Sequence, residues 1–188
     1  DYKGLIIALF TLSAGLSRPF SGKLTDTIGR VPVMIIGTMV CVVCSLFYPI
    51  LTTVSGFLLL RFFHGFSTGF KPTASTAYAA DIIPVLRRGE GVGVLGISMN
   101  IGASRFSSIG SYLAMKYSMD ILFYASSFLA LISIGVLLGL RETLENPQKF
   151  KPSLLKISRH EIIERTAIPP AIVALFIYMC FGVMLTIT

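Results

Sequence analysis

Three basic residues, Arg61, Lys71 and Arg105, lie inside long apolar stretches of this sequence. A charged side chain in such a stretch is costly to bury unless a partner or water compensates it. The apolar stretches carry Asp or Glu only at or near their ends. We therefore expect Arg61, Arg105 and Lys71 to line a central polar cavity, where another part of the protein or an anionic ligand compensates their charge.

His64 and Asn100 lie in the same stretches and are further candidates for this cavity. A histidine can relay protons near neutral pH, but we favour a hydrogen-bonded interior side chain for His64. Lys71 has an alternative placement, because a long side chain can follow an apolar surface and put its ammonium group at the membrane headgroups. The sequence leaves both placements of Lys71 open.

The sequence shows no catalytic or metal-binding motif. Cys41 and Cys44 form a C-x-x-C, but it lies in an apolar run without His, Asp or Glu, whereas redox and zinc motifs need a βαβ context or further ligands. We interpret both cysteines as small apolar residues. A membrane-embedded transferase, the alternative reading, would need paired carboxylates or histidines on a span. We therefore expect no enzymatic activity, no cofactor and no metal.

Composition places the chain in a membrane. Of its 188 residues, 13% are charged and 54% are apolar, and the mean hydropathy is +0.80. Soluble domains are about a quarter charged. The net charge is +7, but the basic residues lie between long apolar runs and not in stripes on polar elements, so we expect no nucleic-acid partner. A receptor or scaffold helix bundle is a further alternative. It would need no cations inside its spans, so the three cations argue against it.

Six apolar stretches are long enough to cross a bilayer, which takes about 20 residues. They cover residues 4–21, 31–51, 56–80, 89–116, 121–140 and 168–188. A long polar segment over 141–167 precedes the last stretch, and its apolar and basic residues over 154–165 predict an amphipathic surface helix. We expect an all-α polytopic membrane helix bundle of about six transmembrane helices, with the lipid bilayer as its main partner.

The basic residues of the joints predict the orientation, because cytoplasmic loops carry an excess of Lys and Arg. One side of the predicted bundle carries only Lys3 and Lys116, and the other carries all basic residues of the joints 22–30, 81–88 and 141–167. We therefore expect these three joints to be cytoplasmic.

A motif in the first cytoplasmic joint suggests a family. Gly22, Leu24, Asp26, Gly29 and Arg30 stand in the register G-x-L-x-D-x-x-G-R between two predicted spans. This resembles the signature of the major facilitator superfamily between that family's second and third helices. The family often has Arg or Lys at three positions where this chain departs from the pattern, which are Thr27, Val31 and Pro32.

The resemblance implies a role for these residues as a cytoplasmic gate. In the family, the motif belongs to a charge network that holds the two halves of the transporter together in the outward-facing state. Arg30 needs a nearby carboxylate, and Asp81 at the end of the third predicted span is well placed to supply it. Gly22 and Gly29 allow a tight turn and a close backbone approach.

Two further spans resemble family motifs. Arg61, Gly65 and Gly69 match the fourth-helix pattern R-x-x-x-G-x-x-x-G, with His64 where glutamine is common. We expect these two glycines, and Gly93, Gly102 and Gly110 in the next span, to serve close helix packing. The next span is glycine-rich and partly matches the antiporter signature of the fifth helix, at Gly93, Gly102 and Gly110, but Phe106 and Ser107 replace its Gly-Pro pair.

The resemblance implies a domain organisation and an activity. Residues 1–140 would be family helices two to six with the first helix missing, 141–167 the cytoplasmic loop between halves, and 168–188 the truncated first helix of the second half. The implied activity is secondary transport by alternating access, as proton-coupled efflux of a small molecule, in the bacterial inner (plasma) membrane. The partners would be a small-molecule substrate, protons and the remainder of the same chain. An organic-anion carrier using Arg61 and Arg105 is the alternative.

Overall fold

The computed structural model describes residues 3–51, 53–155, 166 and 168–187, and these form α-helices, short turns and connecting segments without a strand. The helices are α1 (Lys3–Thr27), α2 (Arg30–Phe47), α3 (Val54–Ile82), α4 (Arg88–Lys116), α5 (Met119–Leu138) and α7 (Ile168–Ile187). Single 3₁₀ turns lie at Val85–Arg87 and Pro152–Leu155. The predicted all-α class is confirmed.

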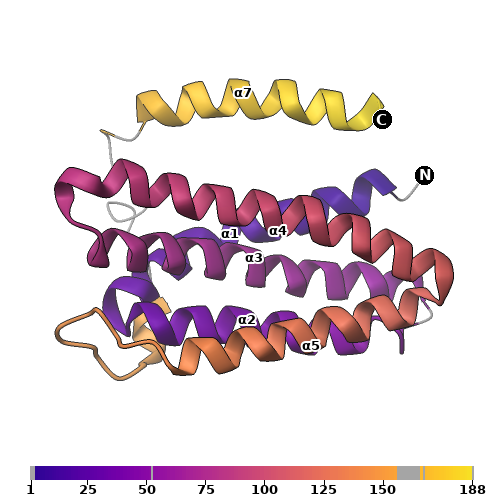
Figure 1. Ribbon diagram of the computed structural model, residues 1–188, viewed down its shortest axis with the longest axis horizontal. Helices are drawn as coiled ribbons and strands as arrows, with labels where there is room; N and C mark the ends of the chain where they lie inside the picture. Colours follow the sequence, from indigo (N-terminus) through magenta and orange to yellow (C-terminus); the bar gives the residue numbers. More distant parts are fainter. Residues whose placement is uncertain (1–2, 52, 156–165, 167, 188) are drawn as a thin grey trace. The chain divides into compact units, whose positions relative to one another are not determined.

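Helices α1 to α5 and the segment up to Leu155 form one compact unit, and α7 lies in a second unit (Figure 1). Within the first unit, α3 packs mainly against α1 and α2, and α2 also packs against α5. Helix α4 makes fewer contacts and has no fully buried residue. The segment after α5 packs back onto the first unit, where Leu154 contacts the core around Leu24. The predicted boundary at residue 140 between transporter half and loop stays a prediction.

Small residues on α1 and α3 allow these two helices to approach closely. Ser13, Ser17 and Ser21 on α1 are fully buried. A Cβ on Gly65 would lie 2.5 Å from the carbonyl oxygen of Phe10, and a Cβ on Gly69 would lie 1.8 Å from Ser17 Oγ. Both positions therefore need glycine for the observed packing, which is the small-residue mode typical of membrane helices.

Gly93, Gly102 and Gly110 of α4 are less crowded than Gly65 and Gly69. A Cβ on Gly93 or Gly102 would meet no other described atom within 4 Å, and one on Gly110 would approach only Leu122 of α5, at 3.1 Å. The packing role of Gly93 and Gly102 stays a prediction, because neither has a close helix neighbour within the described residues. The reason is that α4 contacts its neighbours sparsely.

The end of α1 differs most from the expected span ends, since the helix ends at Thr27 and the expected span at residue 21. Helix α1 continues from the apolar stretch through Thr27, so most of the motif is helical and only Ile28 and Gly29 form the turn. Leu24 and Thr25 are buried and extend the packed face of the helix. The length of an apolar run therefore underestimates the length of a helix whose buried face continues past that run.

Within the part of the chain that the structure describes, three helical ranges are long and apolar enough to cross a membrane by length and composition, namely Gly4–Thr27, Arg30–Phe47 and Met119–Leu138. Helices α3 and α4 have 29 residues each, more than the 20 or so that a span requires, but their polar residues lower the hydropathy. Most of the predicted surface helix over 154–165 lies outside the described residues, and only its first two residues are seen, at the end of the 3₁₀ turn Pro152–Leu155.

Candidate functional site

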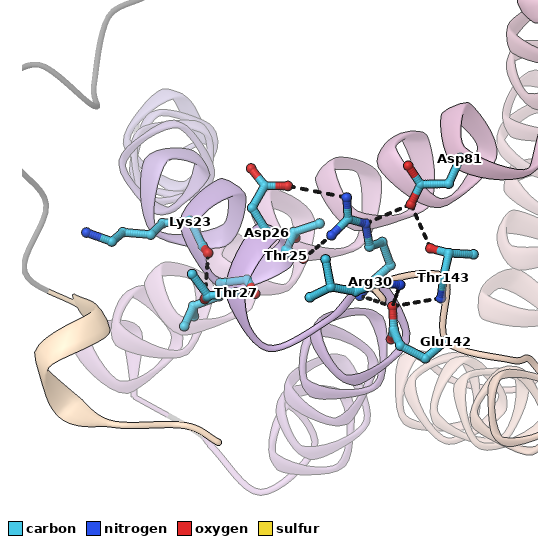
Figure 2. Close-up of polar contacts among 10 residues, drawn as sticks. Lys23, Thr25, Asp26, Thr27, Arg30, Asp81, Glu142 and Thr143 are labelled. Carbon is cyan, nitrogen blue, oxygen red and sulfur yellow. Dashed lines mark hydrogen bonds and ion pairs between the residues drawn. The ribbon is translucent and has the colours of Figure 1, made fainter. Parts of the chain in front are cut away.

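Three segments that are distant in the sequence meet beside the turn between α1 and α2 (Figure 2). The turn contributes Arg30, the last turn of α3 contributes Asp81, and the segment after α5 contributes Glu142 and Thr143. We call these four residues, together with Asp26, the Arg30 network. The network joins the end of α1 and the start of α2 to the end of α3 and to the segment after α5.

The guanidinium group of Arg30 is the centre of the network. Its Nε donates to Asp81 Oδ2 at 2.8 Å, and its Nη1 donates to the carbonyl oxygen of Thr25 at 2.9 Å. Its Nη2 lies 3.6 Å from Asp26 Oδ1. The Arg30 side chain is only 13% exposed, whereas that of Asp26 is 71% exposed. Asp81 is therefore the principal partner, because ion pairs with exposed groups contribute little.

Glu142 binds the N-terminus of α2. Its carboxylate oxygens accept the backbone N–H groups of Arg30 and Val31, each at 2.9 Å. They also accept the N–H groups of Thr143 and Leu144 in its own turn. Free N–H groups and the helix dipole make such a terminus a favourable site for an anion. A single carboxylate thus ties the segment after α5 to the start of α2.

Two opposing effects set the pKa of Glu142. Desolvation raises the pKa of this carboxyl group, but the hydrogen bonds from the N–H groups of Leu144, Arg30, Val31 and Thr143 lower it by more. The net pKa lies below the ordinary value for glutamate. Glu142 is therefore ionised at neutral pH, which is the form that binds the helix terminus.

Gly29 makes room for Glu142. Its φ is +119°, a backbone conformation that residues with a side chain rarely adopt. A Cβ here would also lie 2.5 Å from Glu142 Oε2 and 2.7 Å from its Cδ. Gly22 differs, because a Cβ there would meet nothing within 4 Å in the described part of the chain. Of the two motif glycines, Gly29 is the one that the network requires.

Thr143 completes the contact between α3 and the segment after α5. Its Oγ1 donates to Asp81 Oδ2 at 2.7 Å, so this oxygen serves both Thr143 and Arg30. A further hydrogen bond joins Gln148 N to the carbonyl oxygen of Thr27 at 2.8 Å. The segment after α5 is thereby attached at the ends of α1, α2 and α3.

The predicted cavity residues occupy separate places. The Arg61 guanidinium lies 5.1 Å from the ring centre of Tyr48, 5.3 Å from that of Phe57 and 6.0 Å from that of Phe10. These distances are within the range of cation–π attraction. Its Nε is buried and has no hydrogen-bond partner among the described residues. Aromatic faces from α1, α3 and the end of α2 thus surround this cation.

His64 is a hydrogen-bonded interior side chain in the same neighbourhood. Its Nδ1 lies 3.2 Å from Tyr48 Oη, and its Nε2 lies 3.5 Å from Cys41 Sγ. The Phe10 ring meets it edge-on. This is the environment that we favour from the sequence for His64.

Lys71, Asn100 and Arg105 do not join Arg61. Lys71 lines a cavity between α2, α3, α4 and α5, and Arg61 is not among the residues that line it. Asn100 and Arg105 are exposed on α4, and Asn100 Nδ2 donates to the carbonyl oxygen of Gly96 on its own helix at 2.9 Å. The described residues therefore form no single cavity that contains all the predicted cations.

Comparisons with known proteins decide the family. The family model of the Major Facilitator Superfamily matches residues 1–188. The chain belongs to this family. An uncharacterized MFS-type transporter of Methanocaldococcus jannaschii is 31% identical over 156 residues, which is 82% of this chain and 40% of that protein. Multidrug resistance protein 1 of Bacillus subtilis is 29% identical over 77% of this chain and 37% of its own length.

The quinolone resistance protein NorA of Staphylococcus aureus is 27% identical over 184 residues, or 95% of this chain and 46% of that protein. This major facilitator superfamily chain therefore spans less than half the length of the curated relatives that it matches. Together, the family match and the apolar helices identify an integral membrane protein.

Sequence reasoning missed three residues of this major facilitator superfamily chain. Glu142 and Thr143 lie directly after the last apolar residues of a predicted span, where an acid could have been considered as a partner for the motif. Arg18 is a further cation inside the first predicted span, and it is exposed on α1. A search of every apolar stretch for Arg and Lys would have found it.

Proposed function

We propose that the chain forms part of a secondary active transporter that exports a small molecule by alternating access, with protons as the coupling ion, in a bacterial plasma membrane. Family membership and the names of two relatives, a multidrug and a quinolone resistance protein, support efflux. The observation that carries the proposal is the Arg30 network, because it forms a switchable contact at one end of the helix bundle.

The network suits a gate because its contacts are polar, few and clustered. Alternating access requires one end of the bundle to close while the other opens. Arg30 holds Asp81, and Glu142 holds the N-terminus of α2, so breaking these contacts frees the end of α3 and the segment after α5. Polar contacts of this kind exchange readily with water, whereas the packed α1–α3 interface does not. We place the network on the cytoplasmic side, following the distribution of basic residues.

The test is transport by the protein of natural length in proteoliposomes, with Asp81→Asn compared with wild type. Loss of a charged hydrogen-bond partner that is two-thirds buried costs about 1.5–3 kcal/mol, so we expect transport to slow by about tenfold or more. Glu90→Gln is the matched control, because Glu90 also pairs with an arginine, Arg87, but both side chains are largely exposed. Its transport rate should stay within about twofold.

Proton coupling has a separate test. Collapse of the pH gradient with a protonophore should stop export in wild type if protons drive it. Export that continues at the same rate without a proton gradient would contradict the coupling, while leaving the carrier proposal intact. Equal rates for wild type, Asp81→Asn and Glu90→Gln would contradict the gating role of the Arg30 network.

An organic-anion carrier is a second candidate. It is favoured by Arg61, a cation held among three aromatic rings with no carboxylate among its described contacts, and by the exposed Arg105 on α4. Competition between an organic-anion dye and a lipophilic-cation dye distinguishes the two. Transport of the anion that is lost in Arg105→Ala would support the anion carrier, whereas transport of the cation that is unchanged in Arg105→Ala would support drug efflux.

A further inference from the structure

Lys71 lies in the first unit, and it is a member neither of the aromatic group that surrounds Arg61 nor of the Arg30 network. It is on α3, eleven residues before the end of that helix, and its side chain is half-buried. A Cβ on Gly37 of α2 would lie 3.1 Å from Lys71 Cγ, 3.2 Å from Lys71 N and 2.9 Å from Phe70 Cβ. The glycine therefore provides the space that the stem of Lys71 occupies, and this contact fixes the side chain between α2 and α3.

The side chain of Lys71 lines a cavity of about 240 Å³. Hydroxyl groups from three helices line the same cavity: Thr38 on α2, Ser75 on α3 and Ser133 on α5. The remaining wall is apolar and consists of Met34, Pro72, Met99 and Leu137. The volume has room for several water molecules or a small polar group. Lys71 and hydroxyl-bearing residues of three helices thus line one space, in which Thr38 Oγ1 donates to the carbonyl oxygen of Met34 at 2.8 Å and Ser75 Oγ donates to that of Pro72 at 3.2 Å.

The charge of Lys71 has no protein partner in the described part of the chain, since it makes no hydrogen bond or ion pair there. The acids of the Arg30 network are committed elsewhere, because Asp26 and Asp81 contact Arg30, and Glu142 binds the start of α2. A lysine at this depth is costly to keep charged without compensation. An ammonium group offers three donors and no acceptor, so the missing partner is an acceptor with negative charge.

We propose that this cavity binds a phosphate-type oxyanion, with the Lys71 ammonium group as the charge partner and the Ser133 hydroxyl as a further donor. The hydroxyls of Thr38 and Ser75 would join them by turning away from the backbone carbonyl oxygens that they now bind. Lysine binds phosphate as a point charge. A tetrahedral oxyanion has acceptor oxygens for donors on both α3 and α5, which a single chloride ion would satisfy less well. The site goes beyond the proposed transport function, since it lies inside one helix unit.

The position of the cavity is compatible with two sources of a phosphate group, a phospholipid and the solution. Leu137 is next to the last residue of α5, and Met34 is the fifth residue of α2, so the cavity extends toward the end of the bundle that carries Arg30. The headgroup phosphate of a phospholipid could enter there, with its chains against the apolar wall. A free phosphate group from solution has the same donors available.

The experiment measures thermal unfolding of the purified protein of natural length in detergent. One arm adds inorganic phosphate against sodium chloride of equal ionic strength, and the other adds phosphatidylglycerol against diacylglycerol with the same chains. We expect at least one probe to raise the unfolding temperature of wild type, and Lys71→Met to weaken the apparent affinity by about tenfold or more. Lys116→Met, which removes the same charge from the exposed end of α4, should respond as wild type.

A second variant tests the site independently, in case Lys71→Met does not fold. Ser133→Ala keeps the charge and removes one hydroxyl group, so we expect about a threefold weaker response. A response to phosphatidylglycerol alone identifies a lipid, and a response to phosphate alone identifies a soluble anion. The proposal is overturned if wild type responds to neither probe, or if Lys71→Met and Ser133→Ala respond as wild type does. Transport has no part in these measurements, so they are independent of the carrier proposal.

Discussion

At the scale of single residues, Gly29 and Glu142 form a matched pair. Gly29 has the positive φ that allows the sharp turn into α2, and the absence of its Cβ leaves the space that the Glu142 carboxylate fills. The carboxylate then binds the N–H groups that the turn exposes. The backbone conformation, the missing side chain and the anion each depend on the other two.

Gly29→Ala should therefore destabilise the protein. The substitution places a side chain at a φ of +119° and moves the Glu142 carboxylate away from the start of α2. We expect a cost of about 1–3 kcal/mol, measured by thermal unfolding in detergent. Gly22→Ala is the control, because a Cβ there meets no described atom and alanine is the better helix former. Equal losses in both variants would show that the turn does not need glycine.

Glu142 should give the protein a pH-dependent stability. Its pKa is lower in the folded state than in the unfolded state, so its stabilisation is complete above the unfolded value of about 4.3 and is lost as the pH falls through the folded value. We expect Glu142→Gln to lower the unfolding temperature at pH 7 and to flatten its dependence on pH below about 5. Glu145→Gln, in the same segment but exposed, should leave the pH profile unchanged.

At the scale of elements, the α1–α3 interface depends on two glycines and a row of serines. Gly69 faces Ser17 Oγ and the carbonyl oxygen of Ala14, which would be 1.8 and 2.7 Å from an added Cβ. The second of these is backbone and cannot rotate away. The two helices must therefore separate to accept any side chain at this position.

Gly69→Ala should weaken the α1–α3 interface. Overpacking of this kind costs about 1–3 kcal/mol, which we expect to appear as a lower unfolding temperature in detergent. Gly93→Ala on α4 is the control, because it adds the same methyl group where no described atom lies within 4 Å. A loss of stability in Gly93→Ala that equals the loss in Gly69→Ala would mean that helix propensity, and not the interface, controls the result.

The elements show how far sequence reasoning extends. Apolar runs predict the helices, and small residues spaced four apart predict the face of α3 that contacts α1, because both patterns are local. The helix ends are missed where burial continues past the apolar run, as at Leu24 and Thr25. Arg30 and Glu142 are 112 residues apart, and no local pattern states that the segment after α5 returns to α2. Such contacts depend on the folded topology.

At the scale of the whole molecule, the Arg30 network connects segments that local structure leaves independent. Asp81 at the end of α3 and Glu142 after α5 do not contact each other directly, but Arg30 and Thr143 bond to both. The side chain of Arg30 holds Asp81, while its backbone N–H holds Glu142. A change at either acid should thus be felt at the other through the position of Arg30.

A double-mutant cycle tests this connection. We expect Asp81→Asn and Glu142→Gln to be non-additive, with an interaction free energy of about 0.5–3 kcal/mol in unfolding, because the first substitution frees the Arg30 side chain that orients the start of α2. The pair Asp81→Asn and Glu145→Gln is the reference cycle, since Glu145 is exposed in the same segment. Sums that agree within about 0.3–0.5 kcal/mol for both cycles would show two independent contacts and no single gate. A coupling confined to the Glu142 cycle would mean that α2, α3 and the segment after α5 separate together, which is what a cytoplasmic gate requires.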